Sequence, residues 1–142
     1  MRQSIALTAL LVDEYDRAIE YYVGKLGFVL VEDATLSETK RWVVVRPPGA
    51  TEGGLLLARA ADERQKRAIG DQAGGRVFLF LRTDDFTRDH GAFLNRGVTF
   101  LGEPRREDYG MVAVFEDLYG NRWDLIEPLM PTAYTDKWDE HR

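Results

Sequence analysis

The chain has 142 residues, of which 44% are hydrophobic and 30% charged, and its formal net charge at pH 7 is −5. This length and composition predict one domain, residues 1–142, with a substantial hydrophobic core. The acidic balance argues against nucleic acid or an anionic membrane as the main partner, because both attract basic surfaces. Cysteine is absent, which excludes disulfides, thiolate nucleophiles and cysteine-based metal sites.

The first half of the chain has the pattern of a βαβββ unit. An apolar run at 5–12 (IALTALLV) is typical of a buried strand, and 13–27 carries an apolar stripe at helical spacing. Asp13 is a candidate N-cap of this helix, and Gly27 is placed to end it. Three further runs have strand character, at 28–34, 41–46 and 54–60.

The same order of elements returns in the second half. A strand is predicted at 75–83 and a helix at 84–97, followed by strand-like runs at 98–104, 111–117 and 122–128. Local sequences also correspond, since VDEYDRA (12–18) matches TDDFTRD (83–89). We therefore predict an α+β fold built from two tandem βαβββ modules.

The modules are assigned to residues 4–60 and 75–128, joined by a linker at 61–74 that contains a short charged helix. Residues 129–142 form a C-terminal tail. Within the second module, Arg105 and Arg106 are followed directly by Glu107 and Asp108, whose negative charges balance theirs. This local charge balance favours a solvated hairpin loop over a binding patch.

At this point the sequence resembles the vicinal oxygen chelate superfamily, which contains glyoxalase I, the bleomycin-resistance proteins and the extradiol dioxygenases. The resemblance rests on the doubled βαβββ unit, on VDEYDRAIEYYVGKLGF (12–28) and on FEDLYGNRWDLIEP (115–128). It implies that the two modules form a curved, mixed β-sheet around a cup-shaped site. It also implies a homodimer, and a cytoplasmic location fits the absence of any apolar run near the roughly 20 residues that span a bilayer.

Metal-dependent members of that superfamily place four ligands inside the cup. Carried over position by position, the resemblance puts Leu7, Leu56, Phe78 and Asp124 where those ligands belong. Leucine and phenylalanine have no donor atom, and one carboxylate rarely holds a divalent metal. We therefore expect no metal and no other cofactor, although a non-standard metal site stays open as an alternative.

Asp124 is the one chemically distinctive residue of the expected cup. If its neighbours are apolar, desolvation raises the pKa of its carboxyl, whereas a nearby arginine lowers it. Arg46, Arg82 and Arg122 are the candidate partners in the sequence. Two interpretations stay open: a tentative catalytic or ligand-binding carboxylate, and a structural one that holds the sheet.

Aromatic side chains add an apolar surface to the expected cup. Strand alternation places Phe78 and Phe80 on one face and Val77, Leu79 and Leu81 on the other. The predicted ligand-binding set is Leu7, Trp42, Leu56, Phe78, Phe80, Tyr109 and Asp124. His90, on the inner half of the second helix, is expected to be a packed boundary residue rather than a ligand.

Two function classes follow from these residues and from the resemblance. The favoured one is a protein that binds a small, partly apolar molecule without the four-ligand metal centre. The alternative is a lyase, isomerase or oxidoreductase that uses Asp124 as acid or base, or a non-standard metal site. Fold resemblance does not decide between them, because function depends on the site.

Overall fold

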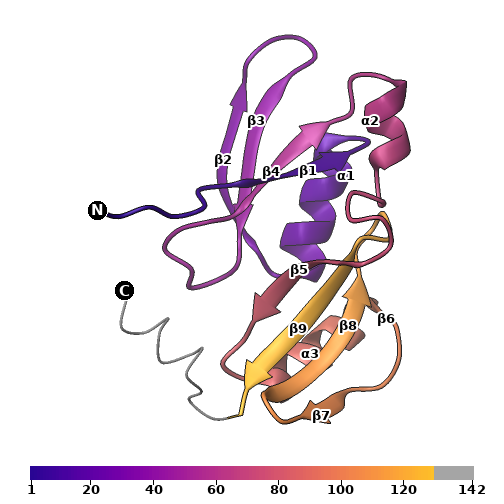
Figure 1. Ribbon diagram of the computed structural model, residues 1–142. Helices are drawn as coiled ribbons and strands as arrows, with labels where there is room; N and C mark the ends of the chain where they lie inside the picture. The colour runs from indigo at the N-terminus through magenta and orange to yellow at the C-terminus, as the bar shows by residue number, and fades with distance from the viewer. Residues whose placement is uncertain (130–142) are drawn as a thin grey trace. The chain divides into compact units, whose positions relative to one another are not determined.

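The computed structural model describes residues 1–129, and the predicted tail from residue 130 onward lies outside the described residues. The chain divides into two compact units: unit 1 is residues 1–75 with 118–121, and unit 2 is residues 76–117 with the chain from 122 onward. Each unit has its own β-sheet and helix (Figure 1), which confirms the predicted α+β fold of two βαβββ modules. The elements are β1 (Thr8–Val12), α1 (Tyr15–Ile19), η1 (Glu20–Lys25), β2 (Val29–Thr35), β3 (Arg41–Arg46), β4 (Leu55–Arg59), α2 (Glu63–Ala68), β5 (Val77–Arg82), α3 (Phe86–Asn95), β6 (Thr99–Phe100), β7 (Arg105–Glu107), β8 (Gly110–Glu116) and β9 (Arg122–Pro128).

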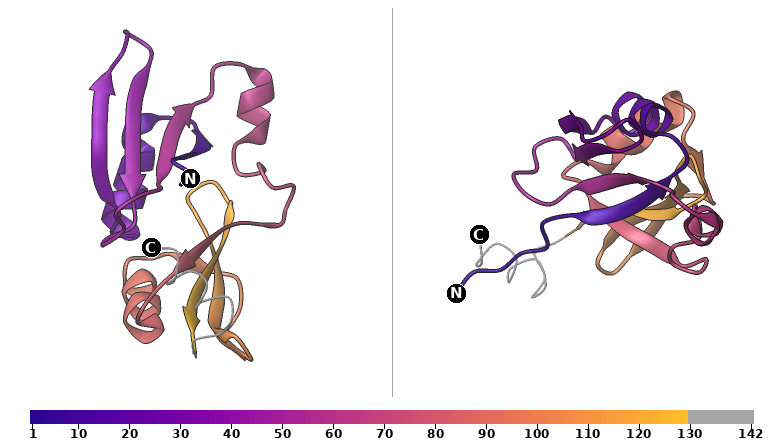
Figure 2. Two further views of the ribbon diagram at one scale, coloured as in Figure 1. Left: turned by 60° about the vertical axis from the view of Figure 1, so that its left-hand side comes forward. Right: turned by 90° about the horizontal axis from the view of Figure 1, so that it is seen from above.

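Unit 1 contains a four-stranded mixed sheet in the order β1-β4-β3-β2. β1 runs parallel to β4, whereas β3 is antiparallel to both β4 and β2. The helix α1 contacts β3 and β4 and covers one face of this sheet (Figures 1 and 2). Alternate strand residues point toward that helix and form the core, which includes Leu10, Val43, Val45 and Leu57.

The predicted first helix is not one regular α-helix. α1 continues directly into η1, a π-helical turn with wider backbone hydrogen bonding. The fully buried Tyr22 lies in η1, as its place on the apolar stripe predicted. The N-cap is Glu14 rather than Asp13, and Asp13 instead accepts a hydrogen bond from the Glu14 amide.

Unit 2 contains the second mixed sheet, in the order β5-β9-β8-β6, with β7 also paired to β8. β5 is parallel to β9, and the other pairs are antiparallel. The helix α3 packs on one face of this sheet and begins at Phe86, whose amide donates to Glu127 of β9 at 2.7 Å. Its N-cap is Asp85, which accepts from the Arg88 amide at 3.0 Å.

A solvated loop was predicted at Arg105 and Arg106, but these residues form a strand, so the prediction was wrong. Both residues belong to β7, which pairs with β8 in the register Arg105↔Val112 and Arg106↔Met111. The expected charge balance does exist, because Arg105 lies 3.6 Å from Glu107. A three-residue edge strand made only of charged residues has too little hydrophobic patterning to be recognised from sequence.

The turn between β8 and β9, Leu118–Asn121, belongs to unit 1 rather than to unit 2. Its Tyr119 hydroxyl donates to Asp13 at 2.7 Å. Burial, together with this hydrogen bond, raises the pKa of Tyr119 well above its ordinary value.

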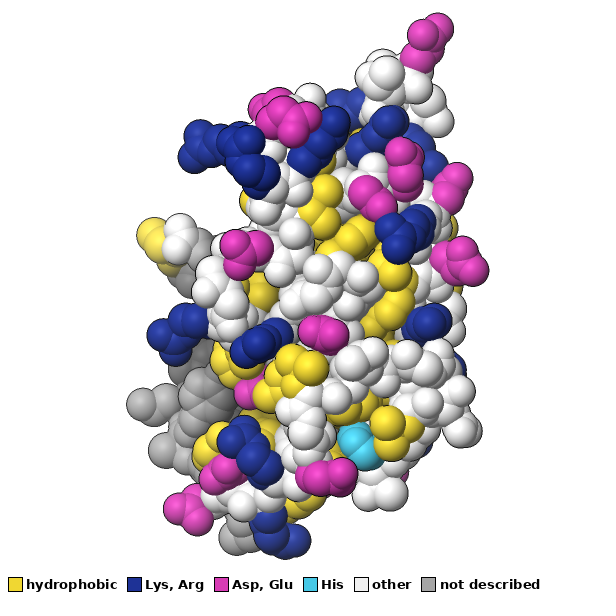
Figure 3. All heavy atoms as spheres, turned by 90° about the vertical axis from the view of Figure 1, so that its right-hand side faces the viewer, with side chains coloured by type: hydrophobic (Ala, Val, Ile, Leu, Met, Phe, Trp, Pro, Cys, Tyr) yellow, Lys and Arg dark blue, Asp and Glu magenta, His cyan; other side chains and the backbone are white. Residues whose placement is uncertain are grey.

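Acidic and basic side chains are interspersed on the face drawn in Figure 3, with apolar side chains between them. Within residues 1–129 no helix is both long and apolar enough to cross a membrane.

Candidate functional site

The alternation of β9 explains where Asp124 points. Trp123 and Leu125 are buried, and Glu127 on the same side caps α3, so these residues face the helix. Asp124 lies between them in sequence and therefore faces away from α3. We call this side of the unit 2 sheet the open face.

Asp124 has apolar neighbours on both sides across the open face. The register pairs it with Phe80 of β5 and with Val114 of β8, and directly paired residues share a face. Phe80 is 68% exposed, which is unusual for a phenylalanine in a sheet strand. The open face thus offers a solvent-facing aromatic ring beside a half-buried carboxylate.

The Asp124 carboxylate is poorly satisfied. Its Oδ1 atom is buried and has no hydrogen-bond partner among the described residues. Desolvation by burial raises the pKa of Asp124, and the charge of Arg105 partly opposes this rise. Arg105 is thus the arginine that acts on Asp124, and it was not among the candidates Arg46, Arg82 and Arg122.

Arg46 belongs to unit 1, where it donates a hydrogen bond to the Gly53 carbonyl oxygen at 2.7 Å. Arg105 reaches the open face through the pairing of β7 with β8, and β7 was not predicted. The sequence signal that could have found it is the cluster of two basic and two acidic residues at 105–108, just before an apolar strand.

The raised pKa of Asp124 predicts how its replacement changes stability with pH. A carboxyl whose folded pKa exceeds its unfolded pKa contributes stability below the unfolded value and loses it as pH rises through the folded value. Asp124→Asn is therefore expected to raise the melting temperature at neutral and alkaline pH relative to the wild type, because the buried carboxyl is costly to ionise. The gain should disappear below the ordinary aspartate pKa of 3.8. Thermal melts across this pH range measure both parts of the expectation.

Asp33 provides a control of opposite sign in unit 1. Its pKa is lowered, first by the hydrogen bond from Arg41 at 2.7 Å. Such a group contributes stability above its unfolded pKa and loses it as pH falls through the folded value. Asp33→Asn should therefore lower the melting temperature at pH 7 and have little effect in acid. A loss of stability at pH 7 in Asp124→Asn would contradict the proposed desolvation of that carboxylate.

The aromatic residues predicted for the site are not all placed as expected. The pairing of β5 with β9 shifts between Val77 and Leu79, so Val77 lies opposite Arg122 and shares the open face. The strict alternation that put Val77 with Leu79 was therefore wrong, because Phe78 occupies a bulge. Tyr109, predicted to bind the ligand, lies in the β7–β8 turn and is 49% exposed.

The remaining predicted residues belong to unit 1. Leu7 lies immediately before β1, rather than in it, and is half-buried. Leu56 pairs with Ala9 and with Val44, and Trp42, two residues from Val44, is 36% exposed. Leu56 and Trp42 share the sheet face that looks away from α1.

These positions do not fit the family's metal centre. Leu7, Leu56 and Phe78 have no donor atom, which leaves Asp124 as a single oxygen ligand. Within residues 1–129, no group of three or more His, Asp or Glu side chains could hold a metal ion. His90 is half-buried against Phe86, with ring centroids 5.3 Å apart, and against Phe100, at 4.5 Å.

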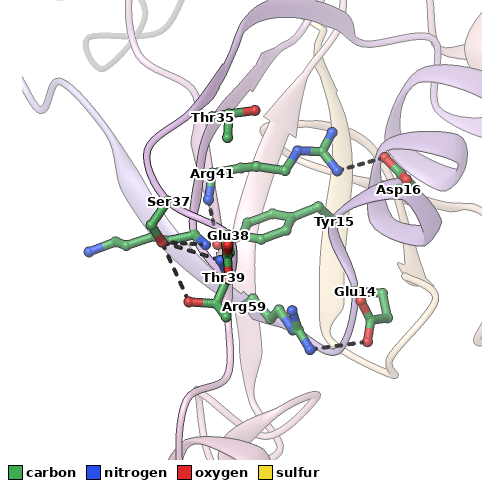
Figure 4. A pocket seen from close by; sticks show the side chains of 10 residues that line it. Glu14, Tyr15, Asp16, Thr35, Ser37, Glu38, Thr39, Arg41 and Arg59 are labelled. Atoms are coloured by element: carbon green, nitrogen blue, oxygen red, sulfur yellow. Dashed lines mark hydrogen bonds and ion pairs between the residues drawn. The ribbon is translucent and has the colours of Figure 1, made fainter.

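A crevice of about 350 Å³ lies in unit 1, between the start of α1 and the β2–β3 loop (Figure 4). Four of its six charged side chains pair with one another: Arg41 lies 2.8 Å from Asp16, and Arg59 lies 3.6 Å from Glu14. The Tyr15 hydroxyl accepts from the Arg41 amide at 3.2 Å. Most of the charge in this crevice is thus already paired, whereas Oδ1 of Asp124 has no hydrogen-bond partner among the described residues. We therefore take the open face as the candidate site.

Two relatives cover nearly the whole chain. An uncharacterized protein of Shewanella frigidimarina (strain NCIMB 400) is 57% identical over 128 residues, which are 89% of this chain and 95% of that one. The uncharacterized protein YurT of Bacillus subtilis (strain 168) is 30% identical over 128 residues, which are 87% of this chain and 98% of that one.

Solved structures show the same similarity. UcmS2 has a TM-score of 0.76 and 28% identity, covering 89% of this chain and 98% of that one. TnmS3, an antibiotic binding protein from Streptomyces sp. CB03234, has a TM-score of 0.73 and 30% identity, covering 89% and 97%. The profile of one superfamily matches residues 4–125. The chain therefore belongs to the Glyoxalase/Bleomycin resistance protein/Dioxygenase superfamily.

Proposed function

We propose that this protein binds a small, partly apolar molecule on the open face of unit 2, without the four-ligand metal centre of the superfamily. The observation that carries the proposal is the exposed Phe80 ring paired with Asp124, whose buried Oδ1 has no hydrogen-bond partner among the described residues. Apolar surface with a few polar groups that fix orientation is the usual composition of a small-molecule site.

The relatives give independent support of a coarser kind. TnmS3 is an antibiotic binding protein, and it shares 30% identity with this chain over nearly its whole length. A binding function of that general type does not require the metal ligands that Leu7, Leu56 and Phe78 replace.

We further propose that the chain forms a homodimer. Gel filtration coupled to light scattering, which measures the molar mass in solution, tests this proposal.

The dye anilinonaphthalene sulfonate tests the binding proposal, because it is aromatic and fluoresces more strongly on apolar surfaces. We expect saturable binding by the wild type and a loss of affinity of about five-fold or more in Phe80→Ala, because a stacked aromatic pair contributes about 1 kcal/mol. Leu94→Ala is the matched control, since Leu94 is also exposed but lies on α3.

Equal binding by wild type and Phe80→Ala, or weaker binding only in Leu94→Ala, would contradict a site on the open face.

A catalytic role for Asp124 is the second candidate function. It is favoured by the raised pKa of Asp124, which suits a group that transfers protons. Turnover of a bound ligand that disappears in Asp124→Asn while binding persists would replace the binder by the enzyme.

A further inference from the structure

The segment between α2 and β5 places one side chain at the edge of the unit 1 sheet. β1 is an outer strand of that sheet, and one side of its backbone has no hydrogen-bonded strand among the described residues (Figure 1). Gln72 occupies this side. The Leu11 amide donates to Gln72 Oε1 at 2.7 Å, and Gln72 Nε2 donates to the Ala9 carbonyl oxygen at 3.1 Å. One glutamine thus makes both kinds of hydrogen bond that a neighbouring strand would make there.

A turn holds Gln72 in this position. After the end of α2, the Asp71 amide donates to the Ala68 carbonyl oxygen at 2.9 Å, and the Gly74 amide donates to the Asp71 carbonyl oxygen at 3.3 Å. Gln72 lies within the turn that the second bond closes. It belongs to unit 1 together with β1, so its contact with the strand lies inside one compact unit.

The sequence of β1 does nothing to protect its edge. Natural sheets keep edge strands from pairing with other chains by means of charged residues, proline or bulges. β1 (TALLV) has no charged residue and no proline, and its register with β4 is unbroken. The opposite edge strand, β2, has a register shift after Leu30 and carries Glu32 and Asp33. β1 is therefore the edge of this sheet that depends on a covering side chain.

The free side of β1 is also complementary to itself. The groups of Ala9 and Leu11 that bond to Gln72 point away from β4. In an antiparallel pair centred on Leu10, Ala9 lies opposite Leu11 of the partner subunit, and the reverse pairing follows from the two-fold symmetry. Each outward N–H group would then face an outward carbonyl oxygen. No charge on the strand opposes this pairing.

We propose that the β1 edge is a pairing surface for a second copy of this chain, and that the Gln72 side chain keeps it closed. Gln72 satisfies the outward groups of Ala9 and Leu11 and takes the place of a partner strand. This surface is separate from the open face of unit 2. It is also separate from the homodimer proposed above, which forms while Gln72 is in place.

Gln72→Ala removes both hydrogen bonds and leaves the sequence of β1 unchanged. At a dilution where the variant has the wild-type molar mass, we expect the Leu11 amide to exchange with deuterium about ten-fold faster than in the wild type. This factor corresponds to a hydrogen bond at the upper end of the usual range. On concentration, light scattering should show a molar mass that rises above the wild-type value.

Two single variants serve as controls. Gln65 Oε1 accepts from the Ala61 amide at 2.7 Å, so Gln65→Ala should speed exchange at Ala61 and leave Leu11 and the molar mass unchanged. Gln72→Glu keeps an acceptor for the Leu11 amide but cannot donate to Ala9 when it is ionised. We expect slow exchange at Leu11 in this variant and no added association, because its negative charge blunts the edge.

A double variant tests the surface itself. Ala9 is exposed, and lysine is a usual means of blocking an edge strand. Ala9→Lys combined with Gln72→Ala should keep the fast exchange at Leu11 and return the molar mass to the wild-type value.

Three results would overturn the proposal. Unchanged exchange at Leu11 in Gln72→Ala would show that Gln72 does not cover β1. Faster exchange without any rise in molar mass on concentration would show that the edge is not a pairing surface. Association that also occurs in Gln65→Ala, or that persists in the double variant, would assign the contact to another part of the chain.

Discussion

Gly70→Ala is expected to lower the free energy of unfolding by about 3 kcal/mol or more, because the new side chain would clash with the backbone. Gly70 has φ +77°, a region that L side chains rarely adopt. A Cβ atom added there would lie 2.0 Å from the carbonyl oxygen of Tyr119. That oxygen is part of the backbone and cannot rotate away, so the chain itself would have to shift. Urea denaturation followed by tryptophan fluorescence measures the loss.

Gly74→Ala is the matched control for this substitution. Gly74 also has a positive φ, +64°, but no atom lies within 4 Å of an added Cβ. Its replacement should cost only the backbone term, about 1 kcal/mol. The difference between the two variants therefore isolates the close approach of Tyr119. Equal losses in both would show that the turn at Leu118–Asn121 does not pack on Gly70.

The repeated fold could be predicted because its signals are local. Each predicted strand and helix has its own hydrophobic period, and both halves have a strand, a helix and then further strands. The second half has four strands after its helix rather than the predicted three, because of β7. Two irregularities, a π-helical turn and a β-bulge, could not be predicted because they do not change the hydrophobic pattern. The π-helical turn keeps the apolar stripe of the helix, and the bulge at Phe78 leaves the strand apolar on both sides of it.

The candidate site could be predicted only in part. A carboxylate between Trp123 and Leu125 in an apolar strand marks Asp124 without any structure, because alternation alone gives it a different face. Its partners depend on pairing between distant strands. Phe80 and Asp124 are 44 residues apart in the sequence, and Arg105, whose charge lowers the pKa of Asp124, lies on a different strand, β7. No local sequence pattern therefore links either residue to Asp124.

Phe115→Ala is expected to destabilise the protein by about 3–5 kcal/mol, the usual range for removing a buried aromatic side chain. Phe115 has 0% exposure and is surrounded by rings: its centroid lies 5.4 Å from that of Phe93, 5.7 Å from Phe100 and 5.8 Å from Trp123. Truncation leaves a cavity that these rigid rings cannot fill. Chemical denaturation gives the free energy, and Trp123 fluorescence reports the loss of packing.

Phe80→Ala is the counterpart on the opposite face of the same sheet. Because Phe80 is 68% exposed, its truncation should change the free energy of unfolding by no more than about 0.5 kcal/mol. A small effect of Phe80→Ala on stability is what the proposed ligand site predicts, because the exposed ring would then serve binding rather than folding. If Phe80→Ala instead destabilises the protein as strongly as Phe115→Ala, the ring is covered in the folded protein. The open face would then be an interior surface, and the small-molecule site proposed there would have no room.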